Sequence, residues 1–446
     1  MPTEVHSNGW ALSRANATRV MNSVFARQVG STMLAHWVTL VVSMGTAAIT
    51  ARWLGPYGKG QLSMLLLVPG ILQLFLSVGM NIANAYYAGS GRLRVDELTA
   101  NSMMFSLLGT AVAVVIVLLL WGSGVLSVLV PGVSTSYLLL GMVALPLSLL
   151  SGSLRGVLHG LRHILTLNIL DIVQSVLRVL MTALFVACLG LNVAGALMAA
   201  VAIQAVGLIA SGWCLRRKGA RFWPRWNPQV VQPTLSYGMK SYIGNLLQFF
   251  NYRFDAFVVN FFLGPAGVGM YGVSVTLAEL LWQLPNAASY VLFPKAANST
   301  HETMNRVTPW VFWFTFAVSF VGAVGLALFG RLAIRIVFSS AFLNAYTPLL
   351  VLLPGVMLLG AAKILTNDIA GRGYPHYNSI TAGMSLVVTV VLDLALIPTM
   401  GVVGAALAST LAYALTFLAS VVFYISVSRK PSAGRASPVQ VLPSCQ

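Results

Sequence analysis

The chain contains twelve apolar runs, each long enough to cross a lipid bilayer as a helix. The runs cover residues 28–52, 60–88, 99–121, 135–156, 163–188, 192–214, 234–262, 268–294, 307–329, 345–370, 376–398 and 402–427. Each run exceeds the roughly 18 residues that distinguish a membrane-spanning helix from a buried one. Charged residues make up 8% of the 446 residues, against roughly 25% in soluble domains. The sequence therefore predicts an all-α polytopic membrane protein and excludes an ordinary soluble enzyme.

The basic residues lie between these apolar runs, and they predict the orientation of the chain. The formal net charge is +17, with 26 lysines and arginines in total. If the N-terminus is cytoplasmic, 18 of these 26 residues fall on the cytoplasmic side and four on the opposite side. This asymmetry is what the positive-inside rule describes. We therefore expect about twelve transmembrane helices with both termini cytoplasmic, and no nucleic-acid partner for the positive charge.

An internal repeat divides the chain into two halves of six helices. The segment Leu54–Gly58 is echoed by Leu263–Gly267, which lies 209 positions later. The segment Val193–Ala196 is echoed by Val402–Ala405 at the same spacing. Transporters built from two such halves hold their substrate between them and alternate its access to the two sides of the membrane. The repeat therefore favours a transporter that works by alternating access.

The repeat and the polar segments also predict the domain organisation. We expect a cytoplasmic lead with an amphipathic stretch, an N-terminal six-helix half, a basic cytoplasmic linker, a C-terminal six-helix half and a disordered cytoplasmic tail. The corresponding boundaries are 1–27, 28–214, 215–233, 234–427 and 428–446.

An ionisable side chain inside a predicted helix raises the free energy of membrane insertion by roughly 2.5–3.5 kcal/mol. We therefore expect each such side chain to have a structural or functional role. Lys240, Asp368 and Asp393 lie near helix ends, where we expect them to reach the membrane interface. The other six are candidates for substrate binding or ion coupling. These candidates are Arg253, Asp255, Glu279, Arg178, Asp171 and Lys363.

Arg253 and Glu279 are predicted to lie at the same depth on neighbouring helices. At 1.5 Å per residue they lie ~14 Å and ~16 Å from the same side of the membrane, so an ion pair between them is geometrically feasible. Asp255 is two residues from Arg253 and points in another direction. The pair could simply join two helices, or it could form a cationic spot in a cavity that an acid can release.

Three further charged residues are candidate contacts for a substrate. Asp171 and Arg178 are seven residues apart and share one helical face, but their separation of about 10 Å is too long for an easy direct bond. Lys363 has no evident partner on its own helix and could contact the substrate.

No catalytic arrangement, nucleotide-binding motif or cysteine spacing for a metal is present in the sequence. We therefore expect a protein that is not an enzyme and that needs no metal or other cofactor.

Several short stretches resemble bacterial polysaccharide (O-antigen-type) flippases of the multidrug/oligosaccharidyl-lipid/polysaccharide (MOP) superfamily. These stretches are Arg52–Gly58, Arg253–Asp255, Phe262–Gly264, Val268–Tyr271, Ile397–Gly401 and Val403–Ala406. Arg52–Gly58 is similar to the family's R-x-L-G-P-x-x-[YF]-G turn, but it is one residue shorter before the last glycine. The resemblance covers nearly the whole chain, and most of its motifs are structural.

The resemblance implies that the protein flips a polyprenyl-diphosphate-linked oligosaccharide from the inner to the outer leaflet for surface polysaccharide synthesis. It also implies a multi-pass protein of the bacterial cytoplasmic membrane, with membrane lipids, a polysaccharide polymerase and assembly proteins as partners. Arg253, Arg178 or Lys363 would shield the diphosphate, and Arg253, Asp255 and Glu279 are the candidates for ion coupling. Three alternatives remain open: an ion-coupled multidrug exporter of the same superfamily, a lipid II flippase, and a non-transporting scaffold of a glycan-assembly complex.

Overall fold

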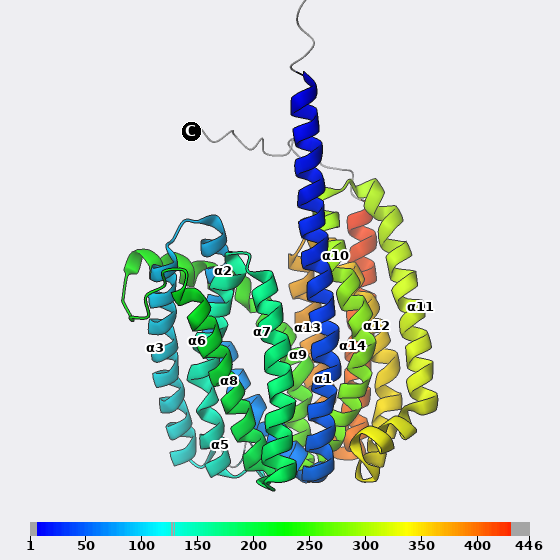
Figure 1. The fold of residues 1–446 in the computed structure, drawn as a ribbon. Helices are drawn as coiled ribbons and strands as arrows, with labels where there is room; N and C mark the ends of the chain where they lie inside the picture. The colour runs from blue at the N-terminus through cyan, green and yellow to red at the C-terminus, as the bar shows by residue number, and fades with distance from the viewer. Residues whose placement is uncertain (1–6, 126–127, 129, 430–446) are drawn as a thin grey trace, which may run out of the picture. The chain divides into compact units, whose positions relative to one another are not determined.

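The computed structural model describes residues 7–125, 128 and 130–429, and every regular element among them is helical (Figure 1). The N-terminal elements are α1 (Ser7–Ser77), α2 (Met80–Ser90), α3 (Val95–Gly122), α5 (Thr135–Met142), α6 (Ala144–Gly160), α7 (Ile164–Thr182), the π-helix η1 (Ala183–Cys188) and α8 (Asn192–Arg216). The C-terminal elements are α9 (Pro228–Ala278), the short 3-10 helix η2 (Glu279–Trp282), α10 (Gln283–Asn298), α11 (His301–Ala333), the π-helix η3 (Ile334–Phe338), the 3-10 helix η4 (Ser340–Ala345), α12 (Tyr346–Gly371), α13 (His376–Met400) and α14 (Val402–Ser428). The first six residues of the predicted lead and residues 430–446 of the predicted tail lie outside the described residues.

Ten helical segments of the described chain are long and apolar enough to cross a membrane. Two of them, Gly30–Ser77 and Asn245–Ala297, have 48 and 53 residues, which at 1.5 Å per residue is over twice the roughly 30 Å of a bilayer core. Each long segment is interrupted at a glycine. Gly55 has φ 66° and ψ −176°, and Gly264 has φ 68° and ψ −173°, a conformation that is essentially restricted to glycine. Divided at these two breaks, the ten segments give the twelve helices that the sequence predicts.

The two glycine breaks pack in a way that repeats along the chain. Five residues after each break is a second glycine, Gly60 and Gly269, again 209 positions apart. A Cβ atom on Gly60 would lie 1.6 Å from the carbonyl oxygen of Pro265, and one on Gly269 would lie 2.0 Å from that of Pro56. No residue with a side chain fits at either position, so the two turns contact each other through their backbones.

A second pair of glycines confirms the repeat at the last helix of each half. A Cβ atom on Gly195 would lie 2.8 Å from the carbonyl oxygen of Phe185, and one on Gly404 would lie 2.3 Å from that of Leu396. In both halves, the last helix therefore begins in close backbone contact with the preceding helical segment. The two six-helix repeats predicted from the sequence are present in the structure.

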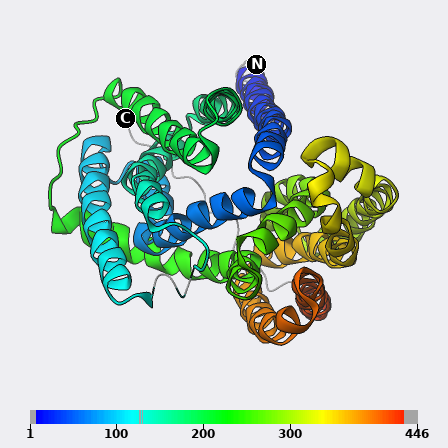
Figure 2. The same cartoon turned by 90° about the horizontal axis from the view of Figure 1, so that it is seen from below.

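The chain forms two compact units. Unit 1 consists of Met1–Leu54, Leu65–Ser127 and Val133–Tyr242, and unit 2 consists of Gly55–Met64, Val128–Gly132 and Ile243–Gln446. In unit 1, α6 packs against α2, α3 and α8. In unit 2, α12 packs against α10, α11 and α14, and α13 lies beside α14 (Figure 2). The central helix of unit 2 is therefore α12, so polar residues on it face other helices.

Candidate functional site

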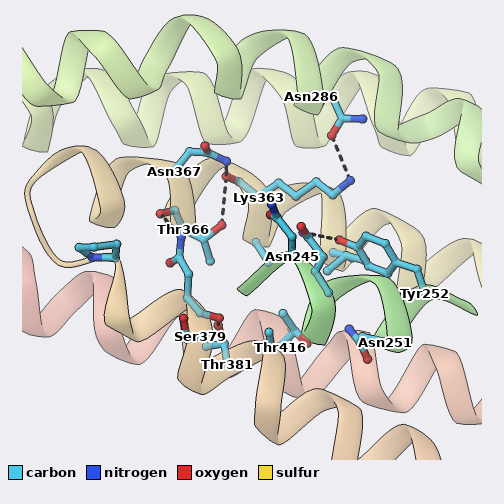
Figure 3. A pocket seen from close by; sticks show the side chains of 16 residues that line it. Asn245, Asn251, Tyr252, Asn286, Lys363, Thr366, Asn367, Ser379, Thr381 and Thr416 are labelled. Carbon is cyan, nitrogen blue, oxygen red and sulfur yellow. Dashed lines mark hydrogen bonds between the residues drawn. The ribbon is translucent and has the colours of Figure 1, made fainter. Parts of the chain in front are cut away.

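Unit 2 contains a cavity of about 590 Å³ whose lining is rich in amides and hydroxyls (Figure 3). The lining side chains come from α9, α10, α12, α13 and α14. The polar ones are Asn245, Gln248, Asn251, Tyr252, Asn286, Lys363, Thr366, Asn367, Asn378, Ser379, Thr381 and Thr416. This lining includes one cationic side chain and no carboxylate. The cavity therefore suits a ligand that has many hydroxyl groups and a negative charge.

Lys363 supplies the positive charge of this cavity. Its Nζ donates a hydrogen bond to Asn286 Oδ1 at 3.0 Å. It also lies 4.1 Å from the centroid of the Trp282 ring and 5.6 Å from that of Tyr252. Trp282 is held in place because its Nε1 donates to the carbonyl oxygen of Val356 at 3.1 Å. No carboxylate of the described chain lies within 4 Å of Lys363, so these uncharged partners orient the ammonium group without neutralising it.

The amide residues of the cavity were missed by the sequence analysis, which considered only charged side chains. Asn245, Gln248 and Asn251 recur every three residues in α9, so they lie along one side of an otherwise apolar helix. Gln248 Nε2 donates to Tyr252 Oη at 3.2 Å. Side-chain amides donate and accept hydrogen bonds at once, as sugar hydroxyls require. Polar residues at helical spacing inside an apolar run were the sequence signal for this site.

The predicted Arg253–Glu279 ion pair is present. Arg253 Nη1 lies 3.5 Å from Glu279 Oε1, and the two side chains are 42% and 27% exposed. Glu279 begins η2, three residues before Trp282, and its charge interacts with Lys363. The pair is thus electrostatically connected with the cavity. Because both side chains are partly exposed, this ion pair contributes little to the stability of the protein.

Asp255 is buried and makes its contacts away from Arg253, as the sequence predicts. Its Oδ2 atom accepts a hydrogen bond from Tyr271 Oη at 2.5 Å and one from Ser409 Oγ at 3.5 Å. Only 4% of Asp255 is exposed. The carboxylate therefore belongs to a polar cluster between α9 and α14, and it is a second centre of charge in unit 2.

The prediction that Asp368 and Asp393 are interfacial side chains is wrong, because both are fully buried. Asp368 Oδ2 lies 2.7 Å from Arg372 Nε, one turn along α12. Asp393 interacts electrostatically with Asp255, but among the described residues neither of its oxygens has a hydrogen-bond partner. Distance from a helix end did not reveal that neighbouring helices cover both positions. The side chain of Lys240 lies outside the described residues.

The two candidates in unit 1 do not contact each other, as their spacing predicts. Asp171 instead forms an ion pair with Arg155 of α6, a residue that is not among the predicted site residues. Arg178 is exposed and has no carboxylate within 4 Å among the described residues.

The described chain contains no group of three His, Cys, Asp or Glu side chains that could hold a metal ion.

In the described part of the chain, membrane-length helices in two repeats and a polar cavity inside one unit define a polytopic helical membrane fold. The fold is similar to that of a multidrug resistance MATE family transporter of the MOP superfamily in its inward-facing conformation, with a TM-score of 0.70 and 15% identity over 89% of this chain and 96% of that one. It is also similar to the lipid II flippase MurJ in an inward closed conformation, with a TM-score of 0.71 and 14% identity over 89% of each chain. At such identities the likeness shows the fold alone.

The sequence defines the family. The model of the polysaccharide biosynthesis protein family matches residues 25–300, and the chain belongs to this family. An uncharacterised membrane protein of Methanocaldococcus jannaschii is 22% identical over 200 residues, which is 44% of this chain and 39% of that relative. The match thus spans about two fifths of the relative's length. The protein is therefore a multi-pass membrane protein of the polysaccharide biosynthesis family, as the resemblance in its sequence implies.

Proposed function

We propose that the protein moves a polyprenyl-diphosphate-linked oligosaccharide from the inner to the outer leaflet of a bacterial cytoplasmic membrane by alternating access. The family match to polysaccharide biosynthesis proteins and the fold likeness to a lipid II flippase support this proposal. The observation that carries it is the cavity of unit 2, where the ammonium group of Lys363 lies among amides and hydroxyls. A polysaccharide polymerase and assembly proteins are the proposed partners.

The chemistry of the cavity matches the part of this substrate that cannot cross hydrocarbon. The diphosphate needs positive charge to replace its water, and Lys363 offers it without a competing carboxylate in the lining. The amides of α9 and the hydroxyls of α13 can replace water around sugar hydroxyls. A volume of about 590 Å³ falls in the range of about 300–1,000 Å³ that is typical of ligand pockets. It can therefore hold part of the headgroup, while the polyprenyl chain stays in the bilayer.

The charged residues around the cavity provide candidates for ion coupling. Arg253 is held by Glu279 at 3.5 Å, and an arriving phosphate would compete with Glu279 for it. Asp255 is the buried acid of the same unit and the third coupling candidate. An inside-negative membrane potential would add ~2.3 kcal/mol per charge per 100 mV in favour of export of an anionic headgroup.

The lining also separates this proposal from that of a multidrug exporter for cationic compounds. A cationic drug would be bound by carboxylates or by the open faces of aromatic rings. Here the ammonium group of Lys363 already lies over the rings of Trp282 and Tyr252. Export of an anionic glycan lipid uses that ammonium group directly.

The proposal is tested by deleting the gene and measuring which leaflet holds the lipid-linked glycan, with an impermeant glycan-modifying enzyme as the probe. We expect a protected inner-leaflet intermediate to accumulate, and wild-type protein to reverse this accumulation. Lys363→Gln should fail to reverse it, whereas Lys295→Gln should succeed, because Lys295 is exposed on α10 and does not line the cavity. A normal leaflet distribution in the deletion strain, with no functional paralogue present, would contradict the proposal.

A further inference from the structure

Unit 1 contains a second cavity, of about 270 Å³, which the proposed function does not use. It lies between the first turns of α3 and the segment that joins α8 to α9. Its lining consists of Arg94, Asp96, Glu97, Ala100, Asn101, Arg221, Trp223, Arg225, Asn227 and Val230. One membrane-spanning segment begins at Val95 and another ends at Arg216. Because these termini adjoin the cavity, it lies where spanning helices end, at the boundary between membrane and water.

The positive charges of this cavity exceed its available negative charges. The carboxylate of Asp96 accepts two hydrogen bonds from Arg94, at 3.1 Å from Nε and 3.2 Å from Nη2. Glu97 Oε2 accepts the backbone N–H of Arg94 at 3.0 Å and so caps the start of α3. Neither Arg221 nor Arg225 has a carboxylate within 4 Å in the described part of the chain. Two guanidinium groups on this wall thus remain able to bind an anion.

These arginines belong to a segment that is held against the helices. Ala220 is buried, and Phe222 packs with it against a core cluster that includes Leu215. At the other end, Asn227 Oδ1 accepts the backbone N–H of Gln229 at 3.1 Å and so begins α9. The backbone that carries the two exposed arginines is therefore held in place at both ends before a ligand arrives, which lowers part of the entropic cost of binding.

A buried hydrogen-bond acceptor belongs to Asn101, one of the residues that line the cavity. Asn101 is 2% exposed, and its Nδ2 donates to Thr234 Oγ1 at 3.0 Å. The hydroxyl hydrogen of Thr234 is already donated to a backbone carbonyl, that of Val230 at 2.7 Å, so the amide of Asn101 cannot be reversed without losing its bond. Its Oδ1 atom has no hydrogen-bond partner among the described residues. A buried acceptor of this kind calls for a donor.

We infer that this cavity binds a phosphodiester whose headgroup carries hydroxyl donors, the chemistry of the phosphoglycerol headgroup of an anionic phospholipid. Arg221 and Arg225 bind the phosphate, because guanidinium groups match its oxygens in geometry and charge. A headgroup hydroxyl donates to Asn101 Oδ1. Trp223 is 69% exposed beside the cavity, and tryptophan favours the depth at which the glycerol backbone of a lipid lies. The inference does not depend on the transported substrate.

Native mass spectrometry of the full-length protein with added lipid tests the site. We expect phosphatidylglycerol to bind more tightly than phosphatidylethanolamine, and the double variant R221Q/R225Q to weaken phosphatidylglycerol binding about tenfold or more. The control R216Q/K218Q removes the same charge from exposed residues that do not line the cavity, and it should bind as the wild type does. Equal losses in the two double variants would overturn the inference, because they would show a general attraction to positive charge.

The role of Asn101 is tested with phosphatidylmethanol, a phosphodiester that lacks headgroup hydroxyls. The wild type should prefer phosphatidylglycerol to phosphatidylmethanol by about three- to tenfold, and Asn101→Ala should abolish this preference. A preserved preference in a folded Asn101→Ala variant would contradict the assigned contact. Glycerol 1-phosphate at equal concentration should not displace the lipid. Displacement would refute a lipid site and assign the cavity to a soluble phosphate ester.

Discussion

Replacing Asp368 with leucine should destabilise unit 2 by about 3–5 kcal/mol, because the change leaves a buried guanidinium group without its counter-charge. Asp368 Oδ2 and Arg372 Nε are 2.7 Å apart, and their side chains are 0% and 1% exposed. Arg372 Nη1 also donates to Asn305 Oδ1 at 2.7 Å, but a neutral amide cannot replace the lost carboxylate.

The reciprocal change should cost less. Arg372→Met leaves a carboxylate that can take up a proton, whereas the guanidinium group left by Asp368→Leu remains charged. The double variant Asp368→Leu/Arg372→Met removes both charges and should recover most of the stability, since well-packed apolar replacements of buried ion pairs are often neutral or stabilising. The expected order of stability is therefore double variant, then Arg372→Met, then Asp368→Leu.

Thermal unfolding of the purified full-length protein, followed by tryptophan fluorescence, measures this order. For a unit of this size, the loss from Asp368→Leu corresponds to a fall in Tm of roughly 10 °C. Asp96→Asn is the control, because the Arg94 side chain of that pair is 78% exposed and exposed pairs contribute about 0–1 kcal/mol. The reasoning is refuted if Asp368→Leu costs less than 1 kcal/mol, or if the double variant is as unstable as that single variant.

Three further changes have defined outcomes. Gly264→Ala should destabilise the protein by about 1–3 kcal/mol, because alanine is strained at φ 68° and ψ −173°. The control is Gly325→Ala in α11, where a Cβ atom would meet no atom within 4 Å. This control should cause no loss of stability in the same thermal unfolding assay. Glu279→Gln should slow the transfer of lipid-linked glycan between the leaflets of proteoliposomes several-fold, and it should change stability by less than about 1 kcal/mol because its pair with Arg253 is partly exposed. Unaltered transfer would remove Glu279 from the coupling candidates. Asp393→Leu should raise thermal stability by about 1–2 kcal/mol, because it replaces a buried carboxyl group, which has no hydrogen-bond partner among the described residues, with an apolar side chain; a fall in Tm would show that the carboxyl group has a stabilising partner.

The helix arrangement could be predicted from the sequence because bilayer thickness fixes helix length and glycine marks the breaks. The spacing of 209 between Leu54 and Leu263 gave the repeat, and the matching conformations of Gly55 and Gly264 give its physical basis. Depth along a helix was also sufficient to pair Arg253 with Glu279, because rise per residue converts sequence position into distance.

The surroundings of a side chain could not be predicted in the same way. In a bilayer, helices are apolar all round, so the sequence does not show which face another helix covers. Asp393 is near a helix end in sequence yet is completely buried, and the partner of Asp171 proved to be Arg155, on another helix. The amides Asn245 and Gln248 carry no charge, so a search for buried charges overlooked them.

Transport by the purified protein in proteoliposomes tests the central claim most directly. Vesicles containing a lipid-linked oligosaccharide in both leaflets are treated with an impermeant glycan-modifying enzyme, and the modified fraction is followed over time. We predict that wild-type protein and Lys295→Gln expose the inner-leaflet glycan to the enzyme, whereas Lys363→Gln behaves like empty vesicles. Protection of the inner-leaflet glycan in wild-type vesicles would contradict the flippase function, and full transport by Lys363→Gln would contradict the assignment of the cavity of unit 2 as the substrate site.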